Sequence, residues 1–292
     1  EQKGVRWDER DLTAEWEARS PGSAFVWNRE QFEAVDPATT DHLLGLFDVS
    51  HMEFEIDRGR DVGGEPSLSE KTAKAIEILS RNPRGFFLLV EAGRIDHGHH
   101  VSNAMRALTE TIELSNAVRT AMEKTRPEET LIVVTADHGH PFTIAGYATR
   151  GNDILGKVVV NDAQGKAEQS PEQDQLGLPY TTLGYPIGPG DPGASDAQPE
   201  GPKHLPPRPR KVQGITAGRP DLQGVDTAEP GYLQETAIPR PYGTHSGEDV
   251  TIHAGGPGAA LFDGVQEQHF IYHAMVEALG WNHAVDSSAS PR

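Results

Sequence analysis

The stretch from Val90 to His100, V-E-A-G-R-I-D-H-G-H-H, places a Glu, an Asp and three His directly after the apolar run 85–89. Ionisable side chains are costly to bury, so a core strand has no use for so many of them. If Asp96 opens a helix, Asp96 and His100 lie one turn apart on the same face. A carboxylate and an imidazole in that arrangement suit zinc, whereas Glu91, an oxygen donor, suits magnesium. The stretch therefore predicts a metal site.

Two further polar clusters border predicted strands. Thr135–His140, T-A-D-H-G-H, directly follows the apolar run 131–135, and Thr244–Asp249, T-H-S-G-E-D, directly precedes the run 249–252. Ligands of open α/β sheets gather outside the carboxyl ends of the strands. His245 comes before its strand, so its arrival at the same edge requires an antiparallel strand or a loop that reaches over.

Each cluster alone has an ordinary explanation as a capped turn or a solvated loop. His97, His99 and His140 in particular are compatible either with support of metal ligands or with plain exposure. The occurrence of two such clusters after two consecutive apolar runs favours a common site.

The elements that must position these clusters follow the α/β pattern. Ser67–Glu70, S-L-S-E, is a capping box that opens a helix ending near Pro83. We expect a buried strand over 85–90, a helix from Asp96 or His97 to about Lys124, and a strand over 131–135. A strand over 249–252 and a helix over about 265–279 complete the core, and 155–160 is a weaker strand candidate.

The helix expected to end near Lys124 has apolar residues at helical spacing, which should form its buried face: Met105, Leu108, Ile112, Ala117, Val118 and Met122. The segment 164–241, by contrast, is rich in Pro, Gly, Asp and Gln, and 186–210 contains little that could form a core. We expect a long surface excursion there, in part without regular structure.

Composition excludes several classes of protein. The 292 residues carry a net charge of -18, which repels phosphate backbones and argues against nucleic acid as a partner. The absence of cysteine excludes disulfides and thiolate metal sites. No apolar run reaches the roughly 20 residues that span a bilayer, and the first residues lack the apolar core of a signal peptide, so any export signal would lie outside this chain.

The motifs resemble those of the alkaline phosphatase family, particularly its animal-type branch. V-E-A-G-R-I-D-H-G-H-H and V-T-A-D-H-G-H-P-F-T-I-A-G-Y resemble the first two metal-binding motifs of that family, and T-H-S-G-E-D-V resembles the third. S-R-N-P-R-G-F-F, A-L-T-E-T-I and L-F-D-G-V-Q-E-Q also fit. The resemblance implies an α/β core with a largely parallel central sheet flanked by helices. It divides the chain into core segments 1–155 and 241–292 and a crown-like, loop-rich insertion over 156–240.

The resemblance also implies two zinc ions, one magnesium ion and a calcium ion. Carried over by motif, the first zinc is bound by Asp96, His100 and His245, the second by Asp137 and His138, and the magnesium by Glu91. His97 lies near the phosphate, and His140 and Arg94 support the ligands without binding metal. For the calcium ion, the matching positions are Phe47 through its carbonyl, Asp48 and Glu65, with the two carboxylates exchanged in length.

One departure from the family is as informative as the match. The family's nucleophilic serine lies in an Asp-Ser-Ala motif in the first half of the protein, and the chain has no such motif; Asp286–Ala289, D-S-S-A, is only superficially similar. The chain therefore resembles the C-terminal portion of an alkaline phosphatase, a phosphomonoester hydrolase that works through a phosphoserine intermediate.

The implied partners are a phosphate monoester, the N-terminal half of the same enzyme and a second copy in a homodimer. The implied location is extracellular or periplasmic, with any membrane anchor outside this chain. Two alternatives stay open: a non-catalytic metal-binding chain that needs a separate N-terminal half, and a relative that acts on phosphodiesters or sulfates with the same metal core.

Overall fold

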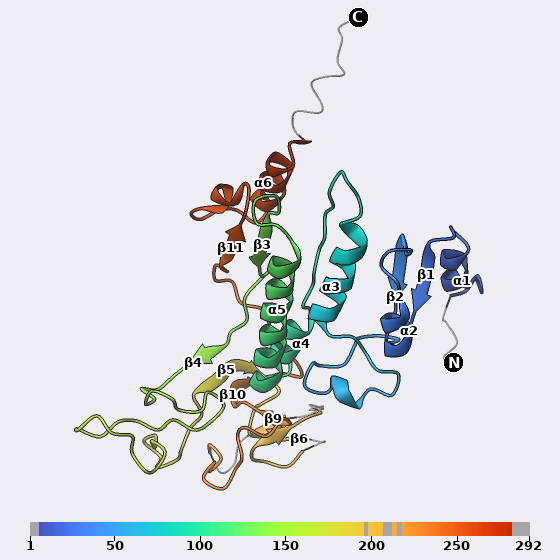
Figure 1. The fold of residues 1–292 in the computed structure, drawn as a ribbon. Helices are drawn as coiled ribbons and strands as arrows, with labels where there is room; N and C mark the ends of the chain where they lie inside the picture. Colours follow the sequence, from blue (N-terminus) through green and yellow to red (C-terminus); the bar gives the residue numbers. More distant parts are fainter. Residues whose placement is uncertain (1–5, 196–197, 207–211, 215–217, 282–292) are drawn as a thin grey trace, which may run out of the picture. The chain divides into compact units, whose positions relative to one another are not determined.

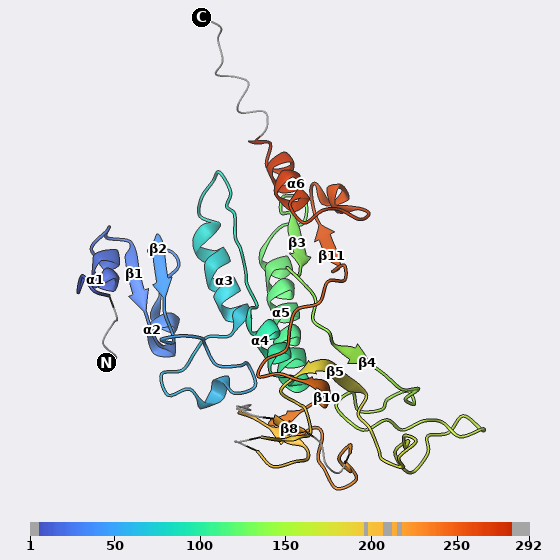
Figure 2. The same cartoon turned by 180° about the vertical axis from the view of Figure 1, so that it is seen from behind.

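The computed structural model describes residues 6–195, 198–206, 212–214 and 218–281 (Figures 1 and 2). The chain forms two compact units. The first comprises Glu1–Glu91, Ile112–Asp137 and Asp249–Arg292, and the second comprises Ala92–Thr111 and His138–Glu248. The expected insertion 156–240 belongs to the second unit, and the Asp286–Ala289 tail and positions 196–197 lie outside the described residues.

The first unit begins with a small βα arrangement. Strands β1 (Ser23–Val26) and β2 (His42–Gly45) pair in parallel, with Ser23 opposite His42. Helix α2 (Arg29–Ala34) connects them, and its N-cap Asn28 accepts a hydrogen bond from the Gln31 amide. Helix α1 (Leu12–Glu17) precedes them and the short 3₁₀ helix η1 (Arg58–Arg60) follows.

Helix α3 (Leu68–Leu79) begins where the capping box predicts. The Ser67 hydroxyl accepts from the Glu70 amide while the Glu70 carboxylate accepts from the Ser67 amide. Glu70 also pairs with Arg29 of α2. The buried Glu113 carboxylate accepts hydrogen bonds from the amide and hydroxyl of Ser69, which joins the start of α3 to helix α5 (Ala104–Lys124).

The remaining strands of the first unit are β3 (Ile132–Thr135) and β11 (Ile252–Gly255). They pair antiparallel, with Ile252 opposite Thr135, which confirms the antiparallel alternative for the strand that follows His245. That strand begins three residues later than the expected 249. After β11 come the 3₁₀ helix η2 (Ala259–Phe262) and helix α6 (Phe270–Ala278), the latter shorter than the predicted 265–279.

The predicted strand over 85–90 was wrong. The segment is extended, but none of the described residues forms a strand ladder with it. Its apolar side chains are not enclosed either, because Phe87 is 58% and Leu89 78% exposed. A β-strand forms only when a second strand pairs with its backbone N–H and C=O groups, and the apolar composition of a segment does not specify such a partner.

The predicted helix from Asp96 to Lys124 is two helices, α4 (Arg94–His100) and α5. The chain breaks between them because Ser102 has a left-handed backbone, with φ of 55°. Asn103 then caps α5, since its Oδ1 accepts from the Arg106 amide while its Nδ2 donates to the carbonyls of Pro230 and Tyr232. Ile112 and Met122, expected on the buried face of α5, are exposed, whereas Ala104, Ala107 and Ala117 are buried.

The second unit contains a three-stranded sheet in the order β10-β5-β4. Its central strand β5 (Leu183–Gly188) pairs in parallel with β10 (Thr236–Pro239) and antiparallel with β4 (Thr143–Ile144). Two short antiparallel pairs accompany it: β6 (Ala194–Ser195) with β8 (Val212–Gly214), and β7 (Lys203–His204) with β9 (Tyr232–Leu233).

The insertion 156–240 has a buried interior, which corrects the expectation of a surface excursion. Five of its apolar side chains are at most 2% exposed: Val158, Leu183, Leu222, Tyr232 and Leu233. The weaker strand candidate 155–160 amounts to an isolated bridge between Lys157 and Thr181. Helices and sheets thus mix throughout the chain, which confirms the α/β class, and none of the described helices has the length and apolar character of a membrane span.

Candidate metal centre

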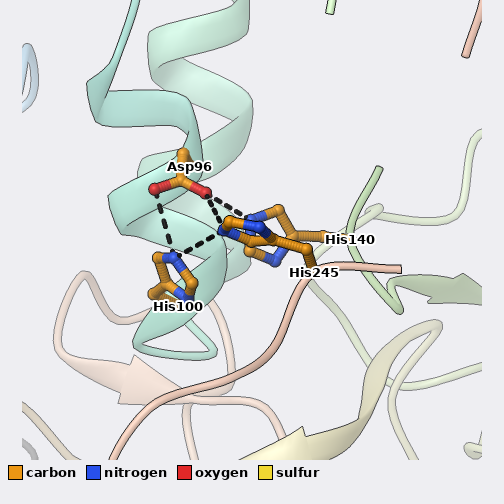
Figure 3. Close-up of side chains that lie close together, drawn as sticks. All are labelled: Asp96, His100, His140 and His245. Carbon is orange, nitrogen blue, oxygen red and sulfur yellow. Dashed lines mark hydrogen bonds and ion pairs between the residues drawn. The ribbon is translucent and has the colours of Figure 1, made fainter. Parts of the chain in front are cut away.

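Asp96 and His100 lie one turn apart on α4, as their spacing predicts. The Asp96 Oδ2 and His100 Nε2 atoms are 3.2 Å apart, and both side chains are half-buried. His245 reaches them from the segment between β10 and β11, with its Nε2 3.3 Å from Asp96 Oδ1 and 3.1 Å from His100 Nε2 (Figure 3). The structure therefore brings together three of the predicted ligands from distant parts of the sequence.

Backbone hydrogen bonds hold the His245 segment in place. The Gly243 amide donates to the His100 carbonyl at 2.7 Å, and the Ser246 amide donates to the Gly139 carbonyl at 3.0 Å. Gly139 suits this approach, because a Cβ there would lie 2.8 Å from the Ser246 hydroxyl oxygen and would force that side chain to shift. The segments that carry His140 and His245 can therefore approach each other closely.

The side chains of Asp96, His100 and His245 approach one another as closely as the ligands of one metal ion do. With bonds of about 2.0–2.1 Å from zinc to nitrogen or oxygen, tetrahedral geometry places the donors roughly 3.3 Å apart. The Nε2 atoms of His100 and His245 are 3.1 Å apart, and Asp96 faces them with different oxygens: Oδ2 is 3.2 Å from His100 Nε2, and Oδ1 is 3.3 Å from His245 Nε2. Each separation is close to that spacing, and a tetrahedral ion held by these three side chains would accept one further ligand.

The tautomer of His100 favours metal binding. Its Nδ1–H donates to the Gly243 carbonyl at 2.8 Å, which leaves the lone pair on Nε2. That lone pair faces Asp96 and His245. Histidine ligands are commonly oriented by a hydrogen bond of this kind from the other ring nitrogen.

His140 is close to the same carboxylate. Its side chain is only 5% exposed, and its Nε2 lies 2.6 Å from Asp96 Oδ1. Burial lowers the pKa of His140, and the hydrogen bond to Asp96 only partly opposes that shift. The Nδ1 atom has no hydrogen-bond partner among the described residues. All four side chains could reach one ion by distance. The predicted role of His140, supporting a ligand without binding metal, stays a prediction.

The carboxylate of Asp96 is kept ionised. Burial acts to raise the pKa of Asp96, but the hydrogen bond from His140 and the proximity of His100 outweigh it, so the pKa is lowered. An anionic carboxylate is the protonation state that binding of a cation requires.

His138 belongs to the same group. Its ring stacks on that of His245, with centroids 3.5 Å apart and planes 14° from parallel, and its Nε2 is 3.9 Å from Asp96 Oδ1. On α4 itself, Arg94 Nη1 and His97 Nδ1 are 3.2 Å apart. The predicted roles of these three residues are not decided by those distances and stay predictions.

The sequence is similar to one family over nearly its whole length. The family model described as alkaline phosphatase matches residues 1–281. The chain belongs to the alkaline phosphatase family. This confirms the family to which the sequence motifs pointed.

Curated relatives from vertebrates are similar to the chain at about 40% identity. The tissue-nonspecific alkaline phosphatase of Gallus gallus is 41% identical over 293 residues, covering 99% of this chain and 50% of the relative. The tissue-nonspecific isozyme of Homo sapiens is 40% identical over 280 residues, covering 94% of this chain and 47% of the relative. The chain spans about half the length of the curated relatives it matches.

Solved alkaline phosphatases share the fold. The enzyme from Thermus thermophilus superimposes with a TM-score of 0.58 at 24% identity and covers 94% of this chain and 59% of its own. A TAB5 alkaline phosphatase mutant with magnesium bound in its M3 site gives a TM-score of 0.53 at 21% identity, over 95% of this chain and 57% of its own. The alkaline-phosphatase-like core expected from the motifs is therefore confirmed.

Two further predicted ligands, Glu91 and Asp137, belong to the first unit. Glu91 directly follows the segment 86–90. Asp137 follows β3, and its backbone carbonyl accepts a hydrogen bond from the Gln268 side chain at 3.1 Å. The predicted magnesium site and the complete second zinc site stay predictions.

The predicted calcium position contains an unusually buried carboxylate. Glu65 is 1% exposed; its Oε2 accepts from the Glu53 amide at 2.8 Å, and Oε1 has no hydrogen-bond partner among the described residues. Burial raises the pKa of Glu65, and the nearby Asp61, Glu53 and Asp48 raise it further. The nearest arginines do not neutralise it, because Arg29 and Arg58 donate to its backbone carbonyl instead. The donor set suits a hard cation.

Sequence reasoning missed the residues that support the group from a distance. Gly243 fixes the His100 tautomer, and Tyr185 hydrogen-bonds His99, but they lie 143 and 86 positions from those partners. No local pattern marks either of them. His99, left open between support and exposure, is half-buried, and desolvation lowers its pKa to about 4.

Proposed function

We propose that this chain carries the principal metal-binding part of an alkaline phosphatase, which hydrolyses phosphate monoesters to an alcohol and phosphate. The observation that carries the proposal is the Asp96, His100 and His245 triad, whose side chains approach one another to 3.1–3.3 Å in a member of this family. We assign zinc to this triad, because a carboxylate and two imidazoles are a common zinc donor set.

The chain's own residues prepare the triad for the ion. His140 fixes the orientation of the Asp96 carboxylate, and the Gly243 carbonyl fixes the tautomer of His100. Zinc bound there would supply Lewis acidity toward a phosphoryl or alcohol oxygen at its open corner. The support for this role is that the three side chains already lie together, with their nearest donor atoms 3.1–3.3 Å apart.

Three further metal assignments belong to the proposal. Asp137 and His138 bind a second zinc, which the contact of His138 with His245 supports. Glu91 binds magnesium. Phe47, through its carbonyl, with Asp48 and Glu65, binds calcium, which the buried unpaired oxygen of Glu65 supports. His97, held by Arg94 on α4, lies near the substrate phosphate.

The proposed active enzyme needs more polypeptide than this chain. The relatives are about twice as long, and the sequence contains no Asp-Ser-Ala nucleophile motif. We propose that an N-terminal half supplies the serine that becomes phosphorylated, that the enzyme is a homodimer, and that it acts in the extracellular space or the periplasm.

Two measurements test the proposal. Elemental analysis after dialysis against zinc should find less zinc in His100→Ala than in the unaltered chain, and equal zinc contents would refute the triad. Hydrolysis of a chromogenic phosphate monoester with zinc and magnesium should need both this chain and the N-terminal half, and a chelator should abolish it. Turnover by this chain alone would contradict the need for a second half, and inactivity of the pair would favour the non-catalytic alternative.

A further inference from the structure

A pair of aromatic side chains, the buried Tyr185 and the half-buried His99, lies next to His140 and is not among the proposed metal ligands. The Tyr185 hydroxyl and His99 Nδ1 are hydrogen-bonded at 2.7 Å, and Tyr185 is 4% exposed. The ring of His99 stacks on His140, with centroids 5.0 Å apart and planes 23° from parallel. A continuous path of contacts therefore leads from Tyr185 through His99 and His140 to Asp96.

His140 depends on this path for its orientation. Its Nε2 is bonded to Asp96, but its Nδ1 has no hydrogen-bond partner among the described residues. One hydrogen bond leaves a ring free to tilt about the bonded atom. The stack with His99 opposes the tilt, as do the edge contacts of the ring with His100, His138 and His245. Of these four neighbours only His99 lies nearly parallel to His140, so the position of His99 helps to set the plane of the His140 ring.

His99 in turn is anchored to a rigid element. Tyr185 lies on β5, the central strand of the three-stranded sheet, and belongs to a buried cluster with Ala104 and Leu183. Phe142 packs against both rings, 5.0 Å from His99 and 5.1 Å from Tyr185 between centroids. The sheet thus supplies a fixed point for a histidine that neighbours the metal ligands.

We propose that Tyr185 is a positioning residue for metal binding, which acts through His99 and His140 on the Asp96 carboxylate. The inference rests on the proposed function, because it presumes that the Asp96 triad binds zinc. Residues that orient metal ligands from behind typically change metal affinity by about 10- to 100-fold when altered. Since Tyr185 is two contacts removed from Asp96, we expect an effect near the lower end, about tenfold.

The chain offers a matched control in Tyr232. It is 2% exposed, it lies in the same unit, and its hydroxyl has no hydrogen-bond partner among the described residues. Tyr232→Phe therefore removes a buried hydroxyl as Tyr185→Phe does, but it breaks no path to the metal group.

The experiment measures zinc affinity of this chain by competition with a chromophoric chelator, alongside the thermal unfolding midpoint. Tyr185→Phe should raise the zinc Kd about tenfold, and Tyr232→Phe should leave it within twofold. His99→Phe keeps the stacked ring and loses the tether, so it should resemble Tyr185→Phe and serves if that variant folds poorly. Because both act through one tether, the double variant should be no worse than either single variant.

The outcomes separate this inference from the proposed function. If His100→Ala loses zinc but Tyr185→Phe and His99→Phe bind it as the unaltered chain does, the positioning role fails and the metal site stands. Additive effects in the double variant, or an equal effect of Tyr232→Phe, would also overturn the role. If His100→Ala binds zinc normally, the proposed function and this inference fail together. Ring ¹⁵N shifts of His140 that change in Tyr185→Phe but not in Tyr232→Phe would support the path directly.

Discussion

At the scale of single residues, the proposed metal site consists of three ligands, Asp96, His100 and His245, and of His140, which hydrogen-bonds the Asp96 carboxylate. Only part of this could be predicted. The spacing of Asp96 and His100 predicts that they meet, because four residues make one helical turn. The tautomer of His100 could not be predicted, since it depends on the carbonyl of Gly243.

Because His245 is a proposed ligand and His140 a proposed support, substituting them should affect zinc binding differently. His245→Ala removes a donor, so zinc at this site should be lost even at saturating zinc. His140→Ala leaves all three donors and should raise the zinc Kd about 10- to 100-fold with the stoichiometry retained at saturation. Equilibrium dialysis with elemental analysis distinguishes the two, and His253→Ala on the exposed face of β11 is the control. Loss of stoichiometry in His140→Ala would make His140 a ligand.

Glu65 predicts that calcium stabilises the protein by an amount that depends on pH. Its pKa is raised in the folded protein, so without a cation its contribution to stability is present at low pH and is lost as pH rises through the folded pKa. Calcium should reverse that loss, raising the unfolding midpoint by a few degrees for about 1–2 kcal/mol of linkage. Calorimetry at pH 5 and pH 8 with and without calcium measures this. Glu65→Gln should abolish the calcium effect, and an unchanged effect would reject the position.

At the scale of elements, prediction succeeds where contacts are local. The start of α3 is marked by the exchange of hydrogen bonds between Ser67 and Glu70, which lies wholly within four residues. The break between α4 and α5 is fixed by Asn103, which donates to carbonyls 127 and 129 positions away. The strand prediction for 85–90 fails for a related reason, since the composition of a segment does not specify which other strand would pair with it.

The cap of α3 predicts a measurable stability loss. Ser67→Ala removes the side-chain acceptor for the Glu70 amide and should lower the free energy of unfolding by about 1 kcal/mol. Denaturant unfolding of both forms gives the value. Ser80→Ala, at the exposed C-terminal end of the same helix, should change it little. Equal losses in the two variants would mean that the capping box contributes nothing specific.

At the scale of the whole molecule, the exposed apolar side chains of the segment 86–90 suggest where the proposed N-terminal half attaches. Phe87 and Leu89 point their apolar surface outward from an extended backbone that has no ladder partner among the described residues. Extended segments of this kind can accept an added strand, with backbone hydrogen bonds giving affinity and side chains giving fit. A strand of the N-terminal half is the expected occupant.

Introducing two negative charges into the segment 86–90 tests this expectation. Phe87→Asp with Leu89→Asp alters exposed positions, so the unfolding free energy of this chain should change by no more than about 0.5 kcal/mol per site. The same change should prevent the N-terminal half from restoring phosphatase activity, because two carboxylates would have to be buried without partners. Leu176→Asp, in an exposed hairpin loop of the second unit, is the control and should leave restoration intact. Restoration that survives the double substitution would place the attachment surface elsewhere on the first unit, and loss in the Leu176 control would show that any added charge is sufficient.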